Sequence, residues 1–142
     1  MKNVSLNDLR DILDETGLRH VKKENVLLVS LPADEDFGCD ILILLAVEGS
    51  RIRAVAGSRD FQAPRANRIQ ALEFCNRWND DKAAPRAYLD EEGYFRLDWF
   101  LYTDVDIAES YIKERFVDLF IASSWQFFKE AGQEFADFER AN

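Results

Sequence analysis

Few side chains in this chain could act as a nucleophile, a base or a metal ligand. There is one histidine, His20, and there are two cysteines, Cys39 and Cys75. A Ser-His-Asp or Cys-His system needs a base that a neighbouring group orients, and neither cysteine lies near His20 in the sequence. Two separate thiols and one imidazole also lack the close ligand pairs of a tetrahedral zinc site. We therefore predict no catalytic residue and no metal, and we interpret His20 as a solvated loop residue.

The carboxylates provide the other candidate chemistry. Four of them cluster in one acidic stretch that could bind calcium: Asp34, Glu35, Asp36 and Asp40. Their spacing departs from an EF-hand loop, with Phe37 where a ligand is expected. Residues 90–93 (DEEG) are typical of a hairpin turn. No pocket is indicated that would separate the pKa values of two acids, and no glycine-rich phosphate loop is present. We interpret these acids as solvated surface and predict no cofactor.

Composition and charge limit the class of protein. At 142 residues, 47% of them apolar, the chain has the size and the core of one domain. Its 18 basic and 27 acidic residues give a net charge of −9, without the dense cationic surface that phosphate backbones require. No apolar run reaches the roughly 20 residues of a membrane-spanning helix. We predict a cytoplasmic protein that binds neither nucleic acid nor membrane.

The first half of the chain predicts one helix and three strands. Ser5 can cap a helix over residues 6–16, and Gly17 suits its end. Strands are predicted over residues 26–31, 41–47 and 51–56. Residues 41–47 (ILILLAV) are apolar at every position, which is the pattern of a central strand covered on both faces.

The second half predicts a helix, two strands and a long helix. The first helix runs from Pro64 to Asn79, with an apolar stripe formed by Ile69, Leu72, Cys75 and Trp78 and widened by Ala71 and Phe74. Strands follow over residues 86–90 and 94–102. The last helix covers residues 106–130, and Gly132 is expected to end it. The predicted fold is a single α+β domain over residues 1–142, with element order αβββαββα and one antiparallel sheet of five strands.

The last predicted helix offers the first candidate binding surface. From Phe116 onward it is apolar around more than half of its circumference, whereas a surface helix needs one apolar stripe. Phe120 points to one side, and Trp125 and Phe128 point to the other. The second side could contact another part of the same chain, or it could form an interface with a second copy or a client protein.

The strand over residues 94–102 offers a second candidate surface. Tyr94, Arg96, Asp98, Phe100 and Tyr102 share one of its faces by alternation. Tyrosine and arginine are frequent interface anchors. The alternative is that these side chains form cross-strand pairs that stabilise a half-exposed sheet.

Three segments resemble the YbjN family of bacterial proteins. They are Phe74–Asn79 (FCNRWN), Pro85–Gly93 (PRAYLDEEG) and Phe95–Asp98 (FRLD). The resemblance extends over roughly residues 5–130 and implies a twisted antiparallel sheet like that of type III secretion chaperones. The family is described as regulators of sensory transduction without an established catalytic activity. In the matching positions, Asn76 and Asn79 would satisfy backbone groups at the helix end, and Trp78 would contact the sheet.

From these observations we predict a non-enzymatic regulatory or chaperone-like module that binds a protein partner and forms a homodimer. The predicted contact residues are Phe120, Trp125 and Phe128, together with Tyr94 and Tyr102. The alternative is a small-molecule sensor with a cavity between sheet and helix. A ligand-dependent rise in melting temperature would identify such a sensor.

Overall fold

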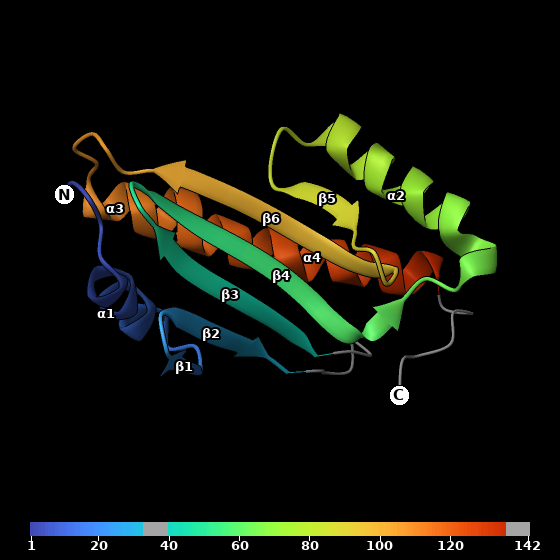
Figure 1. Ribbon diagram of the computed structural model, residues 1–142, viewed down its shortest axis with the longest axis horizontal. Coiled ribbons are helices and arrows are strands. Elements are labelled where there is room, and N and C mark those ends of the chain that lie inside the picture. The colour runs from blue at the N-terminus through green and yellow to red at the C-terminus, as the bar shows by residue number, and fades with distance from the viewer. Residues whose placement is uncertain (33–39, 136–142) are drawn as a thin grey trace.

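The computed structural model describes residues 1–32 and 40–135 (Figure 1). Its elements, in chain order, are α1 (Leu6–Thr16), β1 (His20–Lys23), β2 (Val26–Leu31), β3 (Ile41–Glu48), β4 (Arg51–Gln62), η1 (Arg65–Asn67), α2 (Arg68–Asp81), β5 (Arg86–Leu89), β6 (Tyr94–Tyr102), α3 (Glu109–Tyr111), η2 (Ile112–Asp118) and α4 (Leu119–Glu134). Most of the acidic stretch considered for calcium lies outside the described residues, and so does Cys39.

One antiparallel sheet with strand order β1-β2-β3-β4-β6-β5 organises the fold. The α+β class and the antiparallel sheet are confirmed, but the part of the chain that the structure describes contains six strands, not five. The strand that the prediction missed is β1, whose register runs from His20 opposite Val29 to Lys23 opposite Val26. It is short and mostly polar, as edge strands often are, so no apolar run marks it.

The helix α1 has the boundaries that its sequence predicts. The Ser5 hydroxyl accepts a hydrogen bond from the Asp8 backbone N–H at 3.1 Å, and the Asp8 carboxylate accepts one from the Ser5 N–H at 2.9 Å. This is a capping box, which satisfies two otherwise unpaired donors. Gly17 ends the helix with a φ of 73°, a left-handed conformation that costs glycine little.

The long C-terminal helix differs from its predicted range. It begins at Glu109 rather than at Asp106, passes through the π-helical segment η2, and continues as α4 to Glu134. Gly132 does not end it. A Cβ at Gly132 would lie 3.3 Å from the Phe61 ring, so this glycine allows β4 and α4 to approach closely. Phe135, predicted to lie in a tail, is buried.

The helices cover one face of the sheet, which we call the inner face. In Figure 1, α4 runs behind the strands, while α1 contacts β2 and α2 contacts β5. The inward positions of the strands form the core, and none is more than 2% exposed among Leu27, Val29, Ile43, Leu45, Ile52, Ala54, Ala56, Phe95 and Leu97. None of the helices in the described ranges has the length and apolar character needed to cross a membrane.

The helix α2 buries a different stripe from the one its sequence suggested. Ala71, Phe74, Cys75 and Trp78 are buried, but Ile69 is 73% exposed and Leu72 is 43% exposed. The Phe74 ring lies 5.4 Å from the ring of Phe127 on α4, and the Trp78 ring lies 5.1 Å from it. These aromatic contacts, and not the three-residue spacing, set the rotation of α2 about its axis.

Candidate protein-interaction surface

The structure corrects part of the predicted interface on the last helix. Phe120 and Phe128 are each 1% exposed and belong to the core of the single chain. Trp125 is half-buried and packs against that core. The helix is flanked within the chain by α2, through Trp78 and Phe127, and by α1, where Glu15 pairs with Lys113 at 3.9 Å. Of the two alternatives for the second apolar side, contact within the chain therefore holds for Phe128, and Phe120 on the first side is buried as well.

The predicted residues on β6 lie on the opposite face of the sheet, which we call the outer face. Tyr94 is half-buried, with the Arg96 guanidinium 5.3 Å from its ring centroid. Phe100 is 45% exposed and Tyr102 is 57% exposed. Their rings meet edge to face at 5.2 Å, and the Arg51 guanidinium lies 5.4 Å from the Phe100 ring centroid. The alternation predicted for β6 is confirmed, because Phe95 and Leu97 point inward.

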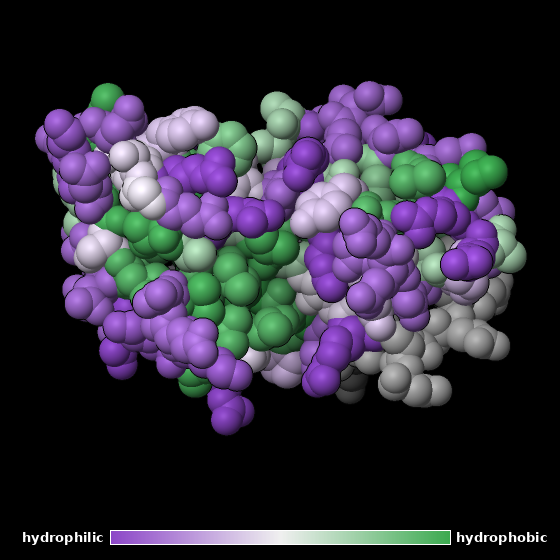
Figure 2. Space-filling model, viewed as in Figure 1, coloured by the Kyte–Doolittle hydropathy of each residue, from purple (hydrophilic) through white to green (hydrophobic). Residues whose placement is uncertain are grey.

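The outer face also carries an aliphatic patch that the sequence analysis did not identify. The register aligns Val21, Leu28, Leu44 and Val55 in one row across four strands. Together with two neighbours the patch comprises Val21, Val26, Leu28, Leu42, Leu44 and Val55. Val21 is 57% and Leu42 is 49% exposed, and the other four are half-buried. Figure 2, which views this face, shows a continuous hydrophobic area over β3 and β4.

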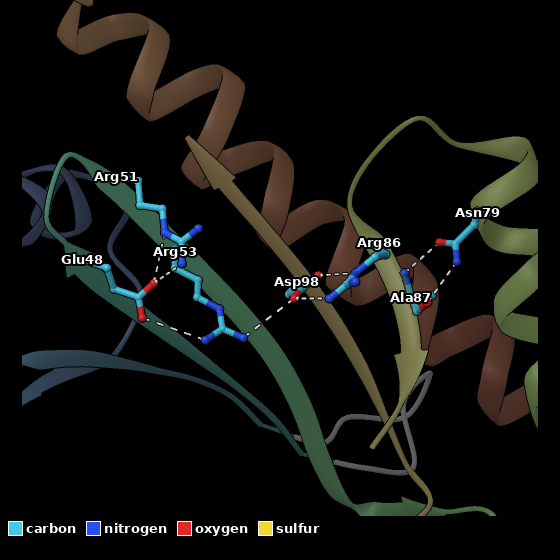
Figure 3. A network of polar contacts seen from close by, with 7 residues as sticks. All are labelled: Glu48, Arg51, Arg53, Asn79, Arg86, Ala87 and Asp98. Atoms are coloured by element: carbon cyan, nitrogen blue, oxygen red, sulfur yellow. Dashed lines mark hydrogen bonds and ion pairs between the residues drawn. The ribbon is translucent and has the colours of Figure 1, made fainter. Parts of the chain in front are cut away.

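A chain of ion pairs borders the aliphatic patch along β4, β6 and β5 (Figure 3). Glu48 pairs with Arg51 at 3.0 Å. Asp98 accepts two hydrogen bonds from Arg86, at 2.8 and 3.0 Å. The Asp98 pair helps to raise the pKa of Arg86 above its ordinary value, chiefly through the hydrogen bond. These side chains are partly exposed, so each pair contributes little to stability.

Arg53 occupies the junction between the patch and the ionic border. Its guanidinium lies 3.9 Å from Glu48 and 3.8 Å from Asp98, which is too far for a hydrogen bond. Its register neighbours are Ala46 on β3 and Phe100 on β6. The outer face thus combines aliphatic, aromatic and guanidinium groups, the side chains that protein interfaces favour at their centres.

A side chain of α2 closes the β5 edge of the sheet. At the β5 edge the Asn79 side chain takes the place of a neighbouring strand at Ala87. It donates to the Ala87 carbonyl at 3.0 Å and accepts from the Ala87 N–H at 2.8 Å. Asn79 therefore satisfies backbone groups as predicted, but those of β5 and not of the helix end, whereas the Asn76 side chain makes no hydrogen bond among the described residues. The Trp78 indole donates to the Pro85 carbonyl at 3.0 Å.

The residues that could do chemistry are engaged elsewhere. His20 is a β1 residue and not a solvated loop residue: its Nδ1 lies 2.8 Å from the Leu18 carbonyl and its Nε2 lies 3.0 Å from the Asp14 carboxylate. Neither ring nitrogen is left to activate a nucleophile. Cys75 is buried, and burial raises the pKa of its thiol to about 12. Within residues 1–32 and 40–135, no three metal-binding side chains come together.

One hollow of about 400 Å³ lies beside α2 and the end of α4, and not between sheet and helix. Its lining includes Trp78, Lys82 and the ion pair between Arg77 and Glu134. The Lys82 ammonium lies 4.3 Å from the Trp78 ring centroid. Three carboxylates and two cations line this open hollow, and nothing in it selects a particular ligand, so it gives no specific support to the small-molecule sensor.

The sequence contained a signal for the missed surface. Residues 41–47 are apolar on both faces, and the structure shows that only one face is covered. Leu42 and Leu44 of β3 therefore reach the surface, contrary to the expectation of a strand buried on both sides. The position of Arg53 beside them depended on strand register, which the sequence did not define.

Comparisons with known proteins agree on one family and one fold. The model of the YbjN family, described as "Putative bacterial sensory transduction regulator", matches residues 5–133. The crystal structure of YbjN, "a putative transcription regulator from E. coli", is similar with a TM-score of 0.60 and 16% identity, covering 89% of this chain and 87% of that one. An uncharacterized protein from Methanothermobacter thermautotrophicus has a TM-score of 0.53 and 17% identity, covering 93% and 99%. No match is found among curated proteins.

Proposed function

The chain belongs to the YbjN family, and on that premise we propose that it is a non-enzymatic regulatory module that binds another protein through the outer face of its sheet. The family description supports a regulatory role. The observation that carries the proposal is the aliphatic patch, which lies next to exposed aromatic rings on a face that none of the described helices covers.

The patch is unusual for a sheet face in contact with water. An antiparallel sheet with one solvated face normally alternates apolar and polar residues along each strand. Here Val26 and Leu28 on β2, and Leu42 and Leu44 on β3, break that alternation. Burial of apolar surface contributes roughly 25 cal/mol per Å², so a partner that covers the patch would be held mainly by these side chains. Contiguous apolar patches of this kind mark interaction sites.

The homodimer predicted from the sequence stays a prediction. Its original support was the doubly apolar last helix, and that support is removed for Phe120 and Phe128. Light scattering on the purified chain would measure the oligomeric state directly.

Affinity capture from a lysate of the native host tests the proposal. The bait is wild-type protein beside a Leu42→Thr, Leu44→Thr variant, because threonine keeps strand propensity while removing apolar surface. We expect a protein that wild type retains and the variant loses. The matched control is Ile69→Ser, which removes an exposed apolar side chain on α2, away from the patch, and should retain that protein. Equal capture by all three folded baits would refute binding through the patch.

A further inference from the structure

The outer face of the sheet differs in charge from the molecule as a whole. Among its paired strand residues, the cations are Lys23, Arg51, Arg53, Arg86 and Arg96, and the anions are Glu48 and Asp98. Asp90 also reaches this face and pairs with Arg96 at 3.2 Å, so five cations against three carboxylates leave the face positive in a chain whose net charge is −9. Charges of opposite sign across an interface favour encounter and suppress wrong partners, so this face selects for an acidic partner.

The ion-pair network shows where an incoming carboxylate would bind. Arg51 and Arg86 each make close hydrogen bonds to one carboxylate. The Arg53 guanidinium stands between the same two carboxylates at 3.8 and 3.9 Å and makes no hydrogen bond to any described residue. Its side chain is 40% exposed. A guanidinium carries five donors in a planar fork that matches a carboxylate, and Figure 3 shows that of Arg53 between Glu48 and Asp98.

We propose that the partner is a protein segment that presents a carboxylate beside aliphatic side chains, and that Arg53 binds the carboxylate while the patch covers the aliphatic groups. This inference rests on the proposed function and specifies the chemistry of its partner. The Arg53 backbone lies two residues from that of Val55, and both side chains belong to the outer face. A segment with an acid next to a leucine, isoleucine or valine matches that juxtaposition.

Two other occupants fit the face less well. Single-stranded nucleic acid binds by stacking bases on aromatic rings along a cationic groove, but valines and leucines make up the patch and two carboxylates interrupt the cationic border. A second copy packed face to face would bring two positive surfaces together, which costs free energy. Both remain outcomes of the test below.

The experiment selects random peptides displayed on phage against the wild-type chain and measures their affinities by fluorescence anisotropy. We expect enriched peptides to carry Asp or Glu beside aliphatic residues. Arg53→Gln should weaken their binding about tenfold at low salt, and the difference should shrink as salt screens the pair. The matched control is Arg10→Gln, which makes the same charge change on an exposed residue of α1 and should leave affinity unchanged.

The outcomes separate this inference from the proposed function. Peptides that need Leu42 and Leu44 but are neutral or basic, or that bind Arg53→Gln as tightly as wild type, overturn the inference and leave the proposed function standing. Peptides that bind regardless of the Leu42→Thr, Leu44→Thr change, or no enrichment at all, count against both. Tighter binding of an oligothymidine than of any peptide, or a dimer that Arg53→Gln strengthens, also overturns the inference.

Discussion

Leu44 and Leu45 are neighbours on β3, yet Leu45 is 2% exposed beneath the helices while Leu44 is half-buried on the outer face. The same contrast separates the two faces of the sheet. The inner face meets α1, α2 and α4 and is apolar along β2, β3 and β6, whereas the outer face is divided between an aliphatic patch and a border of ion pairs. Apolar character alone therefore does not identify a core residue, because the helices that cover the sheet decide which side of a strand is buried.

The largest expected difference between the faces is in thiol reactivity. Two variants, both carrying Cys39→Ser, compare the faces. The first keeps Cys75 as its single thiol, in the core. The second combines Cys75→Ala with Leu42→Cys, which places its single thiol on the outer face. The thiolate is the reactive species, and a pKa of about 12 for Cys75 leaves it roughly a thousandfold less thiolate than an ordinary thiol at pH 8. We expect Leu42→Cys to react with a thiol reagent first by at least that factor. Its rate should level off above its pKa, while that of Cys75 continues to rise with pH.

The same pKa shift predicts how stability depends on pH. Because the pKa of Cys75 is raised in the folded state, the unfolded chain loses this proton first as pH rises. The contribution of Cys75 is therefore complete below about pH 8.5, the ordinary thiol value, and is lost progressively up to about 12. Similar labelling of both thiols in the native protein would show that Cys75 is accessible and would contradict the core assignment.

Phe128 tests whether the last helix belongs to the core or to an interface. Phe128→Ala should lower the free energy of unfolding by about 3–5 kcal/mol, because it leaves a cavity in a buried aromatic cluster. Urea denaturation followed by circular dichroism measures the change. Gln126→Ala, on the exposed side of the same helix, should change it by less than about 0.5 kcal/mol. If the wild type is a dimer and Phe128→Ala is a stably folded monomer, Phe128 belongs to an interface and not to the core.

The neighbouring leucines of β3 test the comparison within one strand. Leu45→Ala should destabilise the protein by about 2–5 kcal/mol, and Leu44→Ala by about 1 kcal/mol or less, since its side chain remains in contact with water. The pair shares backbone, strand and residue type, so each is the control for the other. Equal losses from denaturant titrations would mean that the outer face is covered in solution.

Asn79 tests how the β5 edge is closed. Asn79→Ala removes two hydrogen bonds to Ala87 and should lower the free energy of unfolding by about 1–2 kcal/mol. Asn76→Ala, in the same helix, removes a side chain that makes no hydrogen bond to a described residue. It should leave stability unchanged or slightly raised. Thermal denaturation of the two variants measures both. Equal melting temperatures would contradict the proposed role of Asn79 as a substitute strand.

Local signals predicted most of the fold. The boundaries of α1, β2 and β6 are those expected from the Ser5 cap, Pro32 and the alternation after Gly93. Errors occurred where local signals are weak or where a neighbour decides. The strand β1 is short and polar. Gly132 was expected to end the last helix, but it lies inside the helix, where the Phe61 ring leaves little room for a side chain. The rotation of α2 depends on aromatic contacts with α4, which its own spacing does not encode.

The candidate surface was only half predictable. Alternation placed Tyr94 and Tyr102 on one face of β6, and composition revealed that residues 41–47 are apolar on both sides. The expectation that β3 is covered on both sides was wrong, and the sequence left two alternatives open for the second side of the last helix. The structure buries Phe120 and Phe128 of the helix within the chain, whereas no described helix covers the second side of β3.

The α+β class, the antiparallel sheet and most element boundaries follow from local sequence signals, because caps, turns and alternation act over a few residues. Only the tertiary structure decided which apolar faces are buried and that Arg53 stands between Glu48 and Asp98 beside Val55. Those features depend on strand register and on the placement of helices distant in sequence. No local pattern specifies them, because each is a contact between segments far apart along the chain.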